Sequence, residues 1–267
     1  GRSLLELGRF EEALVALEKA LTYSLHPPRV VTQTHISRGI ALASIGRAAD
    51  GRKAFETAVA MDPEFALAHQ NLGIVQRDAG ELVVAKKSLR RSIELDPTDA
   101  QAYFHLGIAL QQESRPEQAL REFRKALGKG EDSEAWVHIG DAELQANRFD
   151  PAIEAYRKAL DLRPNFAEGW CNLSNALSTA GRHDEAVEAL TKGHNLGRSR
   201  VDWGYPTDAW LADTRAMAVL ARAGEDVAAQ RAAFDRAAAS AQSIEDHATV
   251  VELARRLLGS ASAAKPL

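Results

Sequence analysis

A turn-forming dipeptide recurs at nearly constant spacing along this chain and limits the folds that it can adopt. It occurs six times, as Gly8-Arg9, Gly46-Arg47, Gly80-Glu81, Ser114-Arg115, Asn147-Arg148 and Gly181-Arg182. The steps between successive copies are 38, 34, 34, 33 and 34 residues. A period of 34 residues with one turn signal per unit indicates an array of helix-turn-helix repeats, in which each repeat packs on its neighbours.

Two blocks of apolar residues at helical spacing flank the turn in each unit, which predicts two antiparallel amphipathic helices per repeat. The units align as residues 32–65, 66–99, 100–132, 133–166 and 167–200. They follow a shorter first unit, because the chain begins inside what reads as a first helix, and we therefore expect a truncated N-terminus. The longer first step implies four inserted residues around the segment SLHPPRVV.

Small residues occupy the eighth position of every unit, namely Gly39, Gly73, Gly107, Gly140 and Ser174. A glycine inside a helix costs about 1 kcal/mol relative to alanine. Five small residues in register therefore predict that the two helices approach closely at this point. Large residues of the second helix would fill the remaining space, at Phe55, Leu89, Phe123, Tyr156 and Leu190.

The segment AHQNLGIVQRDAGELVVAKKSLRRSIELDP resembles the consensus of the tetratricopeptide repeat, with its Leu-Gly pair, its alanine at the twentieth place and its closing proline. The resemblance covers roughly residues 1–197, with departures at Arg38, Gly51 and Glu131. It implies an all-α, right-handed superhelical solenoid of tetratricopeptide repeats. We expect the repeat array to occupy residues 1–198.

The repeat pattern weakens after Gly197, where Gly204 and Pro206 indicate a longer connection. Residues 207–222 and 225–241 have the character of a helical pair, which predicts a degenerate repeat. Ser243 fits a helix N-cap and opens a last helix to about Leu258, which would cap the exposed end of the array. Residues 199–267 would thus form a degenerate repeat and a capping helix, followed by a disordered tail.

Composition excludes several classes of function. The chain is 45% hydrophobic and 26% charged with a formal net charge of −4, which is typical of soluble globular proteins and favours neither nucleic acid nor anionic lipid. Basic residues at 86, 87, 90 and 91 alternate with acidic ones on second helices, and we interpret them as a solvated outer face. There is no apolar run long enough to span a membrane and no secretory signal. The compartment is left open, with the cytoplasm favoured.

Signatures of catalysis are missing from the sequence. It contains no phosphate-binding glycine loop, no paired cysteines, no His-Glu-x-x-His and no Gly-x-Ser-x-Gly. His105 and His138 share the sixth position, but equivalent points on successive repeats lie about 10 Å apart, too far for one zinc ion at about 2 Å from each ligand. We interpret His35, His69 and Cys171 as packing residues. The sequence thus predicts a non-catalytic chain without a metal or cofactor.

The family resemblance implies a concave groove lined by the first helices. The sixth position reads Ser37, Asn71, His105, His138 and Asn172, and the ninth reads Ile40, Ile74, Ile108, Asp141 and Asn175. Chaperone-binding members hold a peptide carboxylate with lysine and arginine at the second, fifth and sixth positions, and the five full units have neither there. Amide and imidazole groups beside isoleucines suit an extended peptide instead.

We therefore predict a protein-protein interaction scaffold that binds an extended peptide or protein segment in its groove. The predicted contact residues are Asn71, Ile74, Phe104, His105, Ile108, His138, Asp141, Asn172 and Asn175. Glu134, Asp141 and Glu168 make the C-terminal half of the groove acidic, which favours a ligand with a basic end.

Two alternatives remain open at this point. The arrays of O-linked glycosyltransferases are similar, with asparagines at the sixth position, although only Asn71 and Asn172 match here. The chain could therefore be the substrate-recognition arm of a larger transferase. The other alternative is a scaffold that self-associates through the groove. The identity of the partner lies beyond the sequence.

Overall fold

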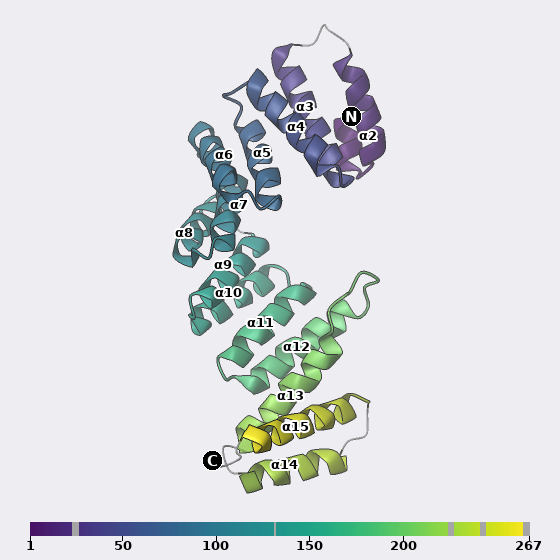
Figure 1. Cartoon of the computed structure of the whole chain (residues 1–267), viewed down its shortest axis with the longest axis vertical. Coiled ribbons are helices and arrows are strands. Elements are labelled where there is room, and N and C mark those ends of the chain that lie inside the picture. The colour runs from purple at the N-terminus through teal and green to yellow at the C-terminus, as the bar shows by residue number, and fades with distance from the viewer. Residues whose placement is uncertain (23–26, 131, 224–226, 241–243, 264–267) are drawn as a thin grey trace. The chain divides into compact units, whose positions relative to one another are not determined.

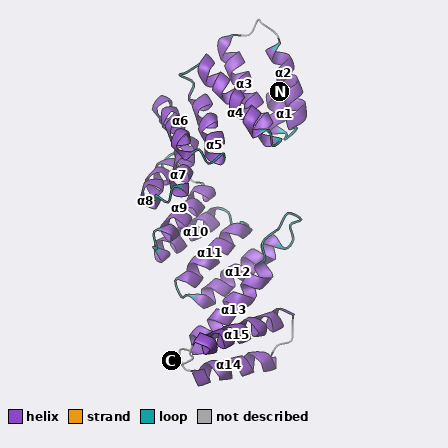
Figure 2. Ribbon diagram, in the orientation of Figure 1, coloured by secondary structure: helices purple, strands orange, loops and turns teal. Residues whose placement is uncertain are grey.

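The computed structural model describes residues 1–22, 27–130, 132–223, 227–240 and 244–263. All regular structure in these residues is α-helical (Figures 1 and 2). The helices are α1 (Arg2–Glu6), α2 (Phe10–Leu21), α3 (Pro28–Ser44), α4 (Ala48–Met61), α5 (Ala66–Asp78), α6 (Leu82–Leu95), α7 (Ala100–Gln112), α8 (Pro116–Leu127), α9 (Ser133–Gln145), α10 (Phe149–Leu162), α11 (Ala167–Thr179), α12 (His183–Gly197), α13 (Thr207–Ala223), α14 (Val227–Ser240) and α15 (Ile244–Ala263). None of these helices is both long and apolar enough to cross a membrane.

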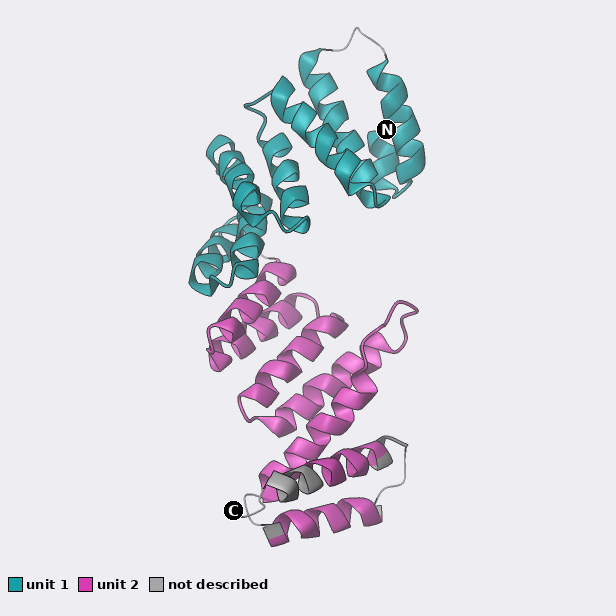
Figure 3. Ribbon diagram, in the orientation of Figure 1, with its two compact units in different colours: residues 1–131 teal, residues 132–267 magenta. Residues whose placement is uncertain are grey.

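The chain divides into two compact units, residues 1–131 and 132–267 (Figure 3). In the first unit, α1 pairs with α2, α3 with α4, α5 with α6 and α7 with α8. The first helices α3, α5 and α7 are successive neighbours, so they line one face of this unit. The division falls at the end of the repeat that is one residue short in the sequence.

The recurring dipeptide marks a left-handed turn in all six repeats. Its first residue has positive φ in each, from 56° at Asn147 to 79° at Gly46. The N–H of the next residue then donates to a carbonyl five residues earlier, as from Arg47 to Leu42 at 2.8 Å and from Arg115 to Leu110 at 3.0 Å. This bond satisfies a carbonyl at the end of the first helix, and glycine adopts the required backbone without steric cost.

The glycines at the eighth position make room for a large side chain of the paired helix. A Cβ atom on Gly107 would lie 2.5 Å from a ring carbon of Phe123, and one on Gly140 would lie 2.6 Å from a ring carbon of Tyr156. Both distances are shorter than a van der Waals contact, and the two rings are buried. The predicted close approach of the two helices is thereby confirmed.

The second unit contains two regular hairpins, α9 with α10 and α11 with α12, and then departs from the repeat pattern. Helices α13 and α14 form close to where the sequence predicts them, but α13 packs mainly against α12 and α15 and less against α14. Phe234 is the one large aromatic residue of α14, so this alanine-rich helix has little to bury. Leu253 of α15, in contrast, is fully buried.

The last helix is longer than the sequence predicts. It ends at Ala263 rather than at about Leu258, because alanine and serine continue the chain without a proline until Pro266. The part of the expected disordered tail beyond Ala263 lies outside the described residues.

Candidate functional site

A largely apolar pocket of about 480 Å³ lies between α3, α4 and α5 in the first unit. Two of the predicted contact residues, Asn71 and Ile74, line it together with Ile40. Asp78 and Arg52 add polar groups to its lining. We name it the N-terminal pocket. The structure thus brings together the amide and the isoleucines that the sequence singled out in two successive repeats.

Asn71 presents an acceptor to this pocket. Its Nδ2 group donates to the carbonyl of Leu67 in the same helix at 2.8 Å. The remaining Oδ1 atom has no partner in the described part of the chain. A hydrogen-bond acceptor therefore stands beside the apolar side chains of Ile40 and Ile74.

His105 is held by an arginine that the sequence did not single out. Arg77 of α5 donates from Nη1 to His105 Nδ1 on α7 at 2.8 Å. A guanidinium carries no acceptor, so Nδ1 must accept and the ring proton sits on Nε2. Arg77 lies at the twelfth position of its repeat, three residues after Ile74 on the same first helix. Its place on a first helix was the signal that could have identified it.

The other two predicted residues of α7 differ in how far they reach the surface. Phe104 is only 6% exposed and its ring packs 5.9 Å from that of Phe123 and 5.4 Å from that of His105, measured between ring centroids. It belongs mainly to the core and supports His105 from below. Ile108 is half-buried, so part of its side chain remains accessible.

In the second unit, a polar chain links the core to the first-helix face. The Tyr156 hydroxyl donates to Asp141 Oδ1 at 2.6 Å, and His138 Nδ1 lies 3.7 Å from Asp141 Oδ2. Burial raises the pKa of Asp141, an effect partly offset by the bond from Tyr156 and by His138. Burial, together with the neighbouring carboxylate, also raises the pKa of Tyr156. Predicted residues His138 and Asp141 therefore lie together.

Asn172 and Asn175 line a second pocket, of about 350 Å³, in this unit. Its opposite wall comes from Tyr205, Trp210 and Asp213, which follow the last regular repeat. Sequence reasoning missed these residues. The cluster of three aromatic residues between Trp203 and Trp210 was the available signal.

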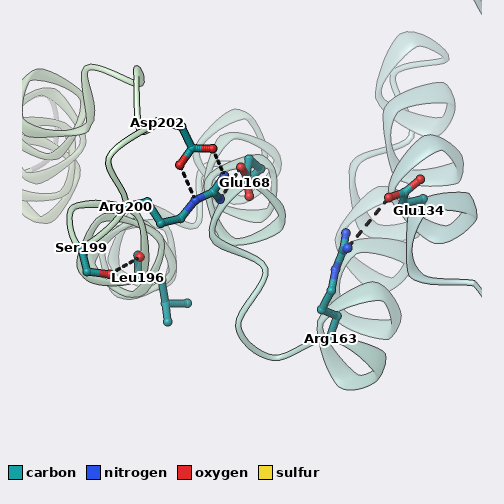
Figure 4. Close-up of polar contacts among 7 residues, drawn as sticks. All are labelled: Glu134, Arg163, Glu168, Leu196, Ser199, Arg200 and Asp202. Atoms are coloured by element: carbon teal, nitrogen blue, oxygen red, sulfur yellow. Dashed lines mark hydrogen bonds and ion pairs between the residues drawn. The ribbon is translucent and has the colours of Figure 1, made fainter. Parts of the chain in front are cut away.

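The acidic character expected for the second unit is largely neutralised by arginines. Arg200 donates to Glu168 at 2.7 Å and to Asp202 at 2.8 Å, and Arg163 lies 3.9 Å from Glu134 (Figure 4). The bond from Arg200 holds the pKa of Asp202 below its ordinary value. These pairs form between helix starts and the loops that follow other helices, so the sequence positions alone did not predict them. The charge argument for a ligand with a basic end is correspondingly weakened.

Several residues interpreted as packing residues do pack in the structure. Cys171 is buried, and burial raises the pKa of its thiol to about 11, so it stays protonated at neutral pH and is a poor nucleophile. His69 bonds the Pro63 carbonyl at 2.9 Å through Nε2, as the indole N–H of Trp170 does with Pro164. Within the described residues, no three His, Cys, Asp or Glu side chains are grouped to hold a metal ion.

The basic residues of α6 are not uniformly solvated, contrary to the sequence interpretation. Lys86 is only 8% exposed and its ammonium group bonds the Glu113 carboxylate at the end of α7. Arg91 pairs with Glu64 and Glu94 on the surface, while Lys87 is exposed. The difference arises because Lys86 faces the next repeat, where Glu113 supplies its counter-charge.

Comparison with family models identifies the family to which these repeats belong. A model of the tetratricopeptide repeat matches residues 36–100, 71–135, 104–165 and 138–193, and a second model of the same repeat matches residues 1–26. These matches cover more than half of the chain, and their spacing agrees with the observed hairpins. The chain belongs to the tetratricopeptide repeat family.

Solved structures show the same fold. A crystal structure of MamA is 25% identical and covers 60% of this chain and 95% of its own, with a TM-score of 0.55. Cut9, from the APC/C heterotetramer Cut9-Hcn1, is 19% identical and covers 96% of this chain and 48% of its own, with a TM-score of 0.67. YrrB, described as a tetratricopeptide repeat protein with an unusual peptide-binding site, is 19% identical, covers 69% and 94%, and has a TM-score of 0.54. No curated protein matches the sequence.

Proposed function

We propose that this chain is a non-catalytic scaffold that binds an extended segment of another protein on the face formed by its first helices. The observation that carries this proposal is the N-terminal pocket, where the Oδ1 atom of Asn71 stands beside the side chains of Ile40 and Ile74. The description of YrrB as a peptide-binding member of the fold supports the same type of ligand.

The pocket suits an extended chain for a physical reason. An extended peptide presents backbone N–H groups and side chains at regular intervals, so an amide acceptor can bind the backbone while an apolar wall takes a neighbouring side chain. Burial of 100 Å² of apolar surface would contribute about 2.5 kcal/mol. Affinity would therefore come mainly from the isoleucines, and orientation from Asn71.

In the second unit, Asn172 and Asn175 provide amides of the same kind, and His138 provides an imidazole. The polar groups are amides, a histidine and paired ions, which recognise a chain without activating a nucleophile. This composition supports a binding role over a catalytic one.

The test is a peptide-display selection against the full chain, followed by calorimetric titration of the selected peptides. The double substitution Asn71→Ala with Ile74→Ala should weaken at least one class of selected peptides by about tenfold or more. Asn195→Ala, at an exposed position of α12, is the matched control and should leave every affinity unchanged. Circular dichroism would establish that all variants keep the same helicity.

Two results would count against this function. If the selected peptides bind the double variant as tightly as the original chain, the N-terminal pocket is not their binding site. If no peptide is selected and light scattering shows a mass that rises with protein concentration, self-association would replace ligand binding.

A further inference from the structure

The pocket that Asn172 and Asn175 line in the second unit has two exposed aromatic residues in its wall, and we call it the aromatic pocket. It is lined by Cys171, Asn172, Ser174, Asn175, Ser178, Leu190, Tyr205, Trp210, Asp213 and Thr214. Cys171, Ser174, Leu190 and Thr214 are buried and form its floor. Tyr205 is 46% exposed and Trp210 is 40% exposed, which is unusual for side chains of their size.

The two exposed rings are held in place by their neighbours. The ring centroids of Tyr205 and Trp210 lie 5.9 Å apart at an interplanar angle of 68°. Tyr205 in turn lies 4.8 Å from Trp203, which packs closely against Gly197. One side of this aromatic pair packs on the rest of the chain, while much of its apolar surface is exposed to solvent. Exposed apolar surface of this kind is typical of a site that contacts a ligand.

The polar groups of the floor and wall are already bonded within the chain. The Ser174 hydroxyl donates to the Ala186 carbonyl at 2.8 Å, and the Thr214 hydroxyl donates to the Trp210 carbonyl at 2.7 Å. Asp213, the one charged residue of the lining, pairs with Arg256 of α15. The pocket therefore presents no unbalanced charge to a ligand.

Five polar groups of the lining have no partner in the described part of the chain. They are the side-chain amides of Asn172 and Asn175, the hydroxyls of Ser178 and Tyr205 and the indole N–H of Trp210. All five are able to donate a hydrogen bond, and the indole N–H can only donate. The aromatic pocket thus offers donors and flat apolar faces, without a net charge.

We propose that the aromatic pocket binds a proline-rich segment of a partner protein in the polyproline II conformation. Proline has no N–H, so a proline-rich backbone offers only acceptors, which matches a rim of donors. Its flat rings pack on aromatic faces, and its preformed conformation loses little entropy on binding. An acidic or basic segment would find no free charge. This inference rests on the proposed function and names the class of ligand for the second unit.

The test is a fluorescence and calorimetric titration of the full chain with acetylated decaproline, with a glycine-serine peptide of equal length as the reference. Trp210→Ala should weaken decaproline binding by about tenfold or more, since it removes the largest exposed ring. Tyr205→Phe keeps the ring and removes one donor, so a smaller loss of about two- to fivefold is expected. Val201→Ala, at a fully exposed position nearby, is the control and should bind as the original chain does.

Three results would contradict proline binding at the aromatic pocket. An original chain that binds no decaproline at about 1 mM peptide, or a Trp210→Ala variant that binds it unchanged, would overturn the assignment. An oligolysine peptide that binds in place of decaproline, and loses affinity in Trp210→Ala, would reassign the pocket to cations. Asn71→Ala with Ile74→Ala should leave decaproline affinity unaltered. The chain could fail to bind decaproline while the selected peptides still bind the original chain more tightly than the Asn71→Ala, Ile74→Ala variant. That result would reject this inference and would still support the proposed function.

Discussion

The hydroxyl of Tyr156 donates a 2.6 Å hydrogen bond to Asp141, joining the buried side of α10 to the exposed face of α9. The equivalent positions in the first unit are apolar, such as Phe55 and Ile40, which pack in one core cluster. Where the ninth position holds a carboxylate, Asp141, the residue of the second helix that contacts it is a tyrosine, Tyr156. The pair replaces an apolar contact with a hydrogen bond.

Replacement of Asp141 by asparagine should stabilise the chain at neutral pH. Burial raises the pKa of Asp141 in the folded state, so the fold favours the protonated carboxyl. The Asp141 carboxyl group therefore contributes fully to the free energy of unfolding below the ordinary aspartate pKa, and this contribution is lost as the pH rises through the raised pKa of the folded state. Urea unfolding at about pH 7 and about pH 3 should show Asp141→Asn more stable at the higher pH and nearly equal at the lower. Asp161→Asn, at an exposed site, should show no such difference.

Removal of the tyrosine hydroxyl tests the same bond from the other side. Tyr156→Phe leaves a half-buried carboxylate without its donor, which should lower the free energy of unfolding by about 1–3 kcal/mol. The loss should be smaller in the Asp141→Asn background, where the acceptor is neutral. A double-mutant cycle in urea measures this coupling, and equal losses in both backgrounds would contradict it.

Gly107→Ala should destabilise the chain by about 1–3 kcal/mol, because the new methyl group would lie 2.5 Å from the Phe123 ring. Gly128→Ala is the matched control, since Gly128 has φ −63° and its Cβ would make an ordinary contact at 3.4 Å. Thermal and urea unfolding of both variants would check the prediction. A Gly107→Ala variant as stable as the control would show that the hairpin shifts freely to accept the methyl group.

Ser114→Gly should stabilise the chain by about 0.5–1 kcal/mol, because Ser114 adopts φ 57°, a left-handed conformation that costs energy for residues with a Cβ atom. Asn147→Gly should give a smaller gain, since asparagine tolerates this conformation at φ 56°. The reverse change, Gly80→Ala, should destabilise by about 1 kcal/mol. Urea midpoints rank the three variants, and any other order would reject left-handed strain as the cause.

Lys86→Ala should lower the free energy of unfolding by about 1–3 kcal/mol, because it leaves the mostly buried Glu113 carboxylate without its main partner. Arg115, 3.4 Å from the same carboxylate, limits the loss. Lys87→Ala removes the same type of side chain from an exposed position and should have almost no effect. Equal stability of the two variants in urea would mean that the buried pair contributes nothing.

The candidate site was only partly predictable. Asn71 and Ile74 line one pocket, and His138 lies beside Asp141, because these residues sit at fixed positions of a repeat whose geometry is regular. Phe104 turned out to be mostly core, since its ring turns toward Phe123. A repeat position indicates which face of a helix a residue occupies, but it does not say how deeply the side chain packs.

The repeat is encoded locally in the sequence. The left-handed turns and the pairing of glycine with a large side chain are properties of a 34-residue unit, and each copy encodes them locally. Three features follow only from the packing in space: Arg200 neutralises Glu168, α15 packs on α13 more extensively than α14 does, and Tyr205 and Trp210 share a pocket with Asn172. These contacts join segments that have no counterpart in the other repeats. No repeating pattern in the sequence predicts these contacts, because they depend on how non-repeating segments pack in space.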